Sequence, residues 1–102
     1  MLLFKKKFLP AIRRGEKTQT IRLWKHRRMK AGQRSYIPGA GHIRITTVEE
    51  VCLEQLTDAD AQPDGFATAD QLRLEITRLY PQQLAQGYLA YRIRFALLSD
   101  GS

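Results

Sequence analysis

The sequence predicts an α+β fold, a small β-barrel of five to six short strands with two or three flanking helices. Residues 88–97 alternate in side-chain character and present one fully apolar face, which is typical of a central strand packed on a core. Residues 68–79 instead carry apolar side chains at helical spacing, and Thr68 with Gln71 forms a capping-box pattern at their start. The length of 102 residues corresponds to one domain, residues 1–102.

The first third of the chain predicts short elements joined by turns. Residues 1–4 are apolar and can open the sheet. Residues 8–14 hold Pro10 where it suits a first helical turn, and Gly15 follows as a residue that can end a helix. The run 18–23 is rich in β-branched residues and therefore predicts a strand.

The middle of the chain predicts an exposed loop followed by more strands. Residues 24–33 are polar, basic and without periodicity, whereas residues 34–37 have the composition of a strand. Residues 42–53 alternate, but the parity of the apolar positions changes between Thr47 and Val48. This change predicts either one long bent strand with a bulge or two separate strands.

Positive charge is concentrated at one end of the chain. The net charge is +7, and residues 1–34 contain twelve lysines and arginines against the single acid Glu16. This asymmetry favours a polyanionic partner, nucleic acid first and an anionic membrane surface second, over a merely solvated basic face. Trp24 lies among these cations, where it can stack on an unpaired base or pack beside Leu23. The candidate nucleic-acid-binding residues are Arg13, Arg14, Arg22, Trp24, Lys25, Arg27, Arg28 and Arg34.

Other classes of protein receive no support. The only cysteine, Cys52, cannot form an intrachain disulfide, and its apolar neighbours predict a small core residue. His26 and His42 lack suitably spaced partners, so no metal and no cofactor are predicted. No run of about 18 apolar residues is present, so we expect no membrane span and a cytoplasmic location. The oligomeric state stays open.

A lysine and a threonine suggest catalytic chemistry. Partial burial and nearby cations would lower the pKa of Lys17, and a neutral lysine can take the proton of the Thr20 hydroxyl. Strand parity places Lys17 on the side of Ile21, so Lys17 meets Thr20 only if it lies in the turn before the strand. A carboxylate must also pass a proton to a leaving amine. The candidate carboxylates are Asp64, Asp60, Asp58 and Glu16.

These residues also resemble a known signature. The pattern Gly15-x-Lys17-x-x-Thr20-x-Arg22, preceded by Phe8 and Ile12, resembles the signature of the ASCH domain, a relative of the PUA domains. Residues 30–33 resemble the family's entry to a strand, residues 64–66 its acidic-Gly-Phe stretch, and residues 88–95 its closing strand. The resemblance covers nearly the whole chain.

The resemblance implies a small PUA-like β-barrel with a cleft lined by this segment, and RNA-linked roles. One branch of small single-domain members is similar to amidohydrolases that remove the acetyl group of N4-acetylcytidine with a lysine, a threonine and a glutamate. Lys17 and Thr20 match the first two. Counted back from Tyr80, the glutamate position falls on Gly65, one residue from Asp64. Other members are similar to single-strand ribonucleases.

We therefore expect a domain that binds RNA, or a nucleoside or nucleotide, in a basic cleft around residues 15–22. The alternatives are an amidohydrolase acting on N4-acetylcytidine with Lys17, Thr20 and Asp64, a ribonuclease-like protein, and a module that binds an anionic membrane or a protein partner. The sequence leaves open whether the chain is an enzyme or a binding module.

Overall fold

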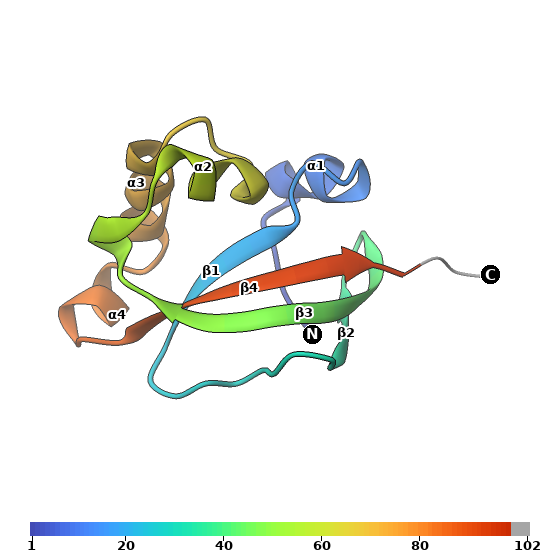
Figure 1. The fold of residues 1–102 in the computed structure, drawn as a ribbon, viewed down its shortest axis with the longest axis horizontal. Helices are drawn as coiled ribbons and strands as arrows, with labels where there is room; N and C mark the ends of the chain where they lie inside the picture. Colours follow the sequence, from blue (N-terminus) through green and yellow to red (C-terminus); the bar gives the residue numbers. More distant parts are fainter. Residues whose placement is uncertain (99–102) are drawn as a thin grey trace.

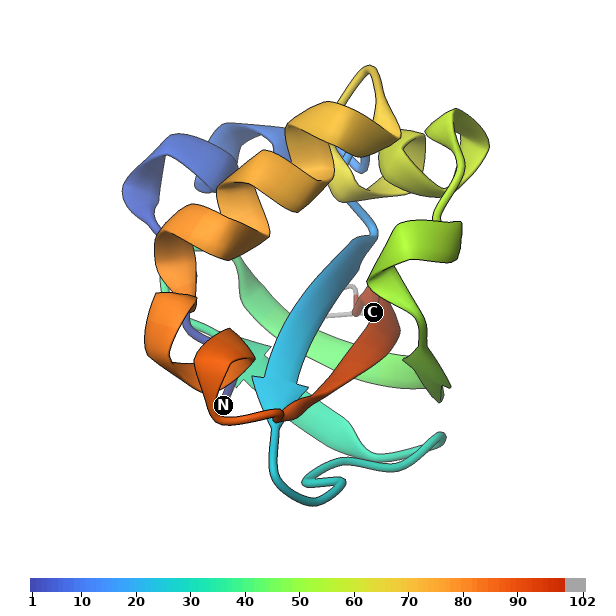
Figure 2. The ribbon, with the colours of Figure 1, turned by 90° about the vertical axis from the view of Figure 1, so that its left-hand side faces the viewer.

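A four-stranded antiparallel sheet organises the molecule, with the strand order β1-β4-β3-β2. The computed structural model describes residues 1–98. Its strands are β1 (Gln19–Trp24), β2 (Arg34–Ile37), β3 (Gly41–Val51) and β4 (Leu89–Leu97). The sheet twists into a curled half-barrel (Figure 2). The last strand of the sequence pairs with both β1 and β3, which confirms its predicted central place.

The helices gather on one side of this sheet, and the loop from β1 to β2 runs along the other (Figure 1). They are α1 (Leu9–Arg13), α2 (Asp58–Ala61), α3 (Ala69–Leu79) and α4 (Pro81–Ala85), with 3-10 turns η1 (Lys6–Phe8), η2 (Leu53–Gln55) and η3 (Gln62–Asp64). The Thr68 hydroxyl accepts a hydrogen bond from the Gln71 amide at 3.2 Å, so α3 begins at the predicted N-cap.

Alternation along β4 divides the core into two clusters. One face carries Tyr91, Ile93 and Phe95, which pack with residues of the other strands and with Leu2 and Ile12 near the start of the chain. Ala90 points to the other face, which α2 and α3 cover. The side chains of β1 alternate between the same two faces, and Thr20 lies opposite Ile93 in the register. Thr20 therefore shares the face of the first cluster.

Within residues 1–98 the structure forms four strands, fewer than the five to six predicted. Residues 1–4 are not a strand, because they form a single backbone–backbone hydrogen bond to the sheet, from the Leu2 amide to the Tyr36 carbonyl. β3 is one continuous strand with a register irregularity between Ile45 and Thr47. This observation confirms the single bent strand and excludes two separate strands.

The prediction for Cys52 was wrong, because its side chain is exposed. It follows the last residue of β3, where the chain leaves the sheet for η2. Its thiol donates to the Glu54 carboxylate at 3.1 Å. The apolar neighbours Val51 and Leu53 misled the prediction, because β3 ends at Val51 and the chain turns away from the sheet at Cys52.

Candidate functional site

A tight turn places Lys17 in front of β1. Gly15, with φ of +77°, follows the C-terminus of α1, and the amides of Glu16 and Lys17 both donate to the Ala11 carbonyl. Glycine suits this turn because a positive φ carries no steric penalty for it. Since β1 starts only at Gln19, strand parity does not apply to Lys17. Lys17 and Thr20 consequently line the same cavity.

The Lys17 ammonium is paired with Asp64 in the interior. Its Nζ lies 2.6 Å from Asp64 Oδ1 and also donates to the Asp64 carbonyl oxygen. The exposed fractions of the two side chains are 3% and 4%. The Thr18 amide donates to the Pro63 carbonyl at 2.8 Å and so joins η3 to the start of β1. The carboxylate that the sequence suggested therefore contacts the lysine directly.

Three aromatic rings surround the same ammonium. The ring centroids of Phe4, Phe8 and Phe66 lie 5.8, 4.9 and 5.7 Å from Lys17 Nζ. Burial lowers the pKa of Lys17, and the negative charge of Asp64 opposes that shift. The cation–π contacts also stabilise the protonated amine, so they oppose the effect of burial in the same direction as Asp64 does.

The Thr20 hydroxyl is oriented by Arg22, two residues along the same strand. Arg22 Nε donates to Thr20 Oγ1 at 3.2 Å, and its Nη2 donates to the Leu3 carbonyl at 2.7 Å. The guanidinium also lies 4.8 Å from the Phe4 ring centroid. Since Oγ1 accepts from Arg22, its own proton stays available to a base. A nearby guanidinium also favours negative charge developing on that oxygen.

A cavity of about 110 Å³ joins these groups. Its walls come from the first residues of the chain, from β1, from the turn at Asp64 and from α3. The apolar lining residues include Phe4, Phe8, Phe66, Leu72, Ile76 and Leu79. The polar ones are Lys5, Lys17, Thr20, Arg22, Asp64, Glu75 and Tyr80. Most of the lining surface is apolar and the polar groups converge on it, which is typical of a small-molecule site.

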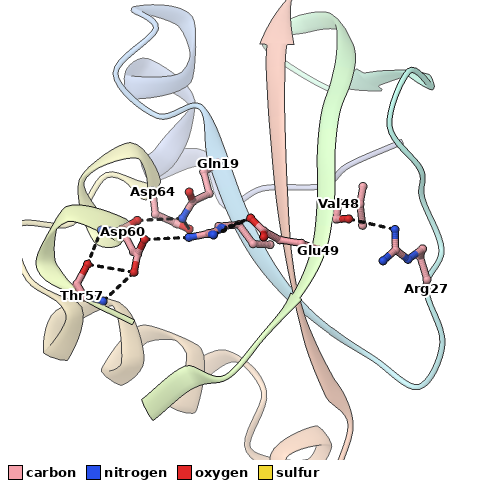
Figure 3. Close-up of polar contacts among 8 residues, drawn as sticks. Gln19, Arg27, Val48, Glu49, Thr57, Asp60 and Asp64 are labelled. Atoms are coloured by element: carbon pink, nitrogen blue, oxygen red, sulfur yellow. Dashed lines mark hydrogen bonds and ion pairs between the residues drawn. The ribbon is translucent and has the colours of Figure 1, made fainter. Parts of the chain in front are cut away.

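A polar network continues from Asp64 across the sheet (Figure 3). Gln19 Nε2 donates to Asp64 Oδ2 at 3.2 Å and to the Asp60 carbonyl at 3.0 Å. Asp60 Oδ1 accepts from Arg92 at 3.0 Å, and Arg92 also pairs with Glu49 at 2.6 Å. Both carboxylate oxygens of Asp64 are thus engaged, one by Lys17 and one by Gln19. This arrangement holds Asp64 in place.

The predicted nucleic-acid-binding residues, Arg22 apart, do not line the cavity. Arg13 donates to the Gly39 carbonyl, and Arg14 pairs with Glu16 at the surface. The side chains of Lys25, Arg28 and Arg34 are exposed.

Two other predicted residues pack onto the protein itself. The Trp24 ring lies 5.5 Å from the Tyr91 ring, and Trp24 packs against the first core cluster. Arg27 donates to the Val48 carbonyl at 3.0 Å, which Figure 3 shows on the side away from Asp64. A second hollow, of about 270 Å³, is lined by Arg27, Arg28, Met29, Lys30 and Gln33.

The sequence interpretation missed Glu75, Tyr80 and the two phenylalanines Phe4 and Phe66 as site residues. One signal for Glu75 was available, because a charged residue stands three positions after Leu72 and four before Leu79 on the apolar face of α3. Phe4 carries no local signal, because it is an ordinary apolar residue in sequence, and Phe66 was noted only as part of the acidic-Gly-Phe stretch.

Groups that could hold a metal ion are absent from the described residues 1–98, where no three His, Cys, Asp or Glu side chains converge. In the same part of the chain, no helix has the length and apolar character needed to span a membrane.

Comparison with known proteins identifies the fold. No protein-family model matches the sequence, and no curated protein matches it either. Among solved structures, the ASCH domain from Lactobacillus crispatus JV V101 superposes with a TM-score of 0.70 at 16% identity, over 85% of this chain and 67% of that one. This chain has an ASCH-like fold.

Two further structures share the ASCH-like fold of this chain. Protein EF3133 from Enterococcus faecalis V583, of family DUF984, matches with a TM-score of 0.74 and 23% identity over 90% of this chain and 67% of that one. The hypothetical protein PH0355 matches with a TM-score of 0.75 and 14% identity over 94% of this chain and 95% of that one. At these identities the likeness concerns the fold.

Proposed function

We propose that this protein hydrolyses an N-acyl group from a nucleobase, with N4-acetylcytidine as the substrate to test. The observation that carries the proposal is the buried Lys17–Asp64 pair in one cavity with the Thr20 hydroxyl. The cavity is small and largely apolar, which suits an acyl group and a base better than a charged polymer backbone. The ASCH-like fold and the Gly-x-Lys-x-x-Thr-x-Arg pattern add support.

In the proposed reaction Lys17 is the general base and Thr20 the nucleophile. The neutral Lys17 amine takes the Thr20 proton, and Oγ1 attacks the amide carbonyl. The C–N bond then breaks, and the amine leaves with a proton returned from the Lys17–Asp64 pair. The acyl group stays on Thr20 as an ester, which water cleaves to release the carboxylic acid and the free hydroxyl. In that second step Lys17 takes a proton from the attacking water and returns it to Thr20 Oγ1, while Asp64 holds the Lys17 side chain in place.

The rate of this reaction is expected to rise with pH. The base must be unprotonated, and burial places the pKa of Lys17 below its ordinary value of 10.5. The value of kcat/KM should therefore increase as pH passes upward through that lowered pKa and then level off. Acetate release from N4-acetylcytidine, measured between about pH 5 and pH 9, checks this expectation. Absence of acetate release across the whole range would overturn the proposed activity.

A second candidate function is RNA binding at the hollow lined by Arg27, Arg28 and Lys30. The concentration of positive charge in residues 1–34 supports it. We expect the double variant Arg28→Ala/Lys30→Ala to weaken binding of single-stranded RNA. The slope of the logarithm of the binding constant against the logarithm of salt concentration should become shallower by about two. The exposed Arg94 of β4 offers a control, Arg94→Ala, which removes one positive charge outside this hollow and should make the slope shallower by about one at most. RNA affinity that is insensitive to salt would exclude this function.

A further inference from the structure

Glu75 is a buried carboxylate that the proposed reaction does not use. It lies on the apolar face of α3, next to Ile76, and its side chain is 9% exposed. Together with Lys17 and Thr20, it lines the cavity. A carboxylate is rarely buried to this extent without a partner, because it loses its hydration.

The partners of Glu75 leave one of its oxygens unsatisfied. Oε1 accepts a long hydrogen bond from Lys7 at 3.4 Å and lies 3.6 Å from Arg78. Lys7 also lies 3.3 Å from Oε2, but the geometry there is an ion-pair contact without a hydrogen bond. Within residues 1–98 no group donates a hydrogen bond to Oε2. The side chains of Lys7 and Arg78 are 52% and 64% exposed, so water screens their attraction.

The chemistry of the cavity decides what could satisfy Oε2. Lys5, Lys17 and Arg22 already line it, so a cationic ligand would meet positive charge. No metal-binding cluster is present in the described part of the chain. Asp64 already accepts a hydrogen bond at each oxygen, so Glu75 Oε2 is the less satisfied carboxylate acceptor in the cavity. A neutral N–H donor on a bound ligand fits these conditions, since it satisfies the carboxylate without adding charge.

We infer that Glu75 accepts a hydrogen bond from an amino or amide N–H of the bound ligand and so selects a base that carries a donor there. The inference rests on the proposed function, because it concerns the same cavity. Cytidine and uridine are nearly equal in shape, but cytidine presents an exocyclic amino group where uridine presents a carbonyl oxygen. A carboxylate facing that oxygen would set two acceptors against each other, which a site built for a donor rejects.

Equilibrium binding of the two nucleosides tests the inference without catalysis. Titrations followed by NMR would give the Kd of cytidine and of uridine for the wild-type protein, Glu75→Gln and Glu50→Gln. Wild type is expected to prefer cytidine by at least about tenfold. Glu75→Gln should reduce the preference to about threefold or less, because its amide can present either oxygen or nitrogen to the ligand. Glu50 is exposed on β3, so Glu50→Gln should keep the wild-type preference.

Circular dichroism of each variant confirms that it is folded. Equal affinity of the wild type for both nucleosides, or no binding of either, would overturn the inference. A preference that survives in Glu75→Gln would overturn it as well. Acetate release from N4-acetylcytidine reports the proposed function separately, so hydrolysis without discrimination counts against Glu75 alone.

Discussion

Replacing Thr20 with valine is expected to lower kcat for N4-acetylcytidine by at least about 10³-fold, as the loss of a nucleophile does in other acyl-transfer enzymes. Valine keeps the shape of threonine and the β-branched preference of β1, but it removes the oxygen that attacks the substrate. Arg22 loses one acceptor and keeps the Leu3 carbonyl, so the fold should persist. Steady-state rates of acetate release, with a circular dichroism spectrum of each variant, measure both effects.

Two matched variants sharpen this test. Thr18→Val makes the same chemical change two residues earlier at an exposed position, and it should leave kcat within about twofold of wild type. Thr20→Ser retains a hydroxyl and should keep measurable activity. Wild-type kcat in Thr20→Val would show that another group, or water, attacks the carbonyl.

Replacing Lys17 with methionine is expected to cost about 3–5 kcal/mol in the free energy of unfolding near neutral pH. The change leaves the Asp64 carboxylate buried without its ion-pair partner, and the Gln19 amide stays as its side-chain hydrogen-bond donor. Methionine matches the length of the lysine stem and keeps contact with the three phenylalanine rings. Urea unfolding measured by circular dichroism gives the free energy directly.

A double-mutant cycle separates the pair from simple packing. The variant Lys17→Met/Asp64→Leu removes both charges and should recover much of the stability that Lys17→Met loses. The exposed Lys5, another cavity-lining lysine, provides the control Lys5→Met, which should change stability by about 0.5 kcal/mol or less. Strictly additive losses in the double variant would contradict the assigned pair.

Patterns within a short stretch of sequence correctly predicted the helix α3 and the strand β4, because residues close together in the chain determine both elements. The Thr68 cap and the apolar spacing of α3 define that helix almost to the residue, and the alternation of β4 placed it in the centre of the sheet. The strand predicted at residues 1–4 was wrong, because a short apolar run does not reveal whether it pairs with a strand or packs on a core. Leu2 packs on the core, where it is buried in the first cluster.

The site could be predicted only in part, because its contacts join distant segments. The Lys17–Asp64 pair spans 47 residues, and no spacing rule links the two positions. Asp64 was one of several candidate carboxylates until the turn at η3 placed it against Lys17. Glu75 escaped notice because helical periodicity assigned its face of α3 to the core. A charged residue on such a face marks a site only when a cavity is seen beneath it.

The walls of the cavity come from four separate parts of the chain, at residues 3–8, 17–22, 64–66 and 72–80. A partly unfolded molecule therefore has no binding site, and any ligand of the cavity binds the native state alone. Mass action then raises global stability, by about 2.7 kcal/mol at a ligand concentration 100 times its Kd. For a domain of this size such a gain raises the melting temperature by roughly 10–20 °C. A melting screen of nucleosides and their acylated forms can thus find the natural ligand of this protein before any turnover is detected.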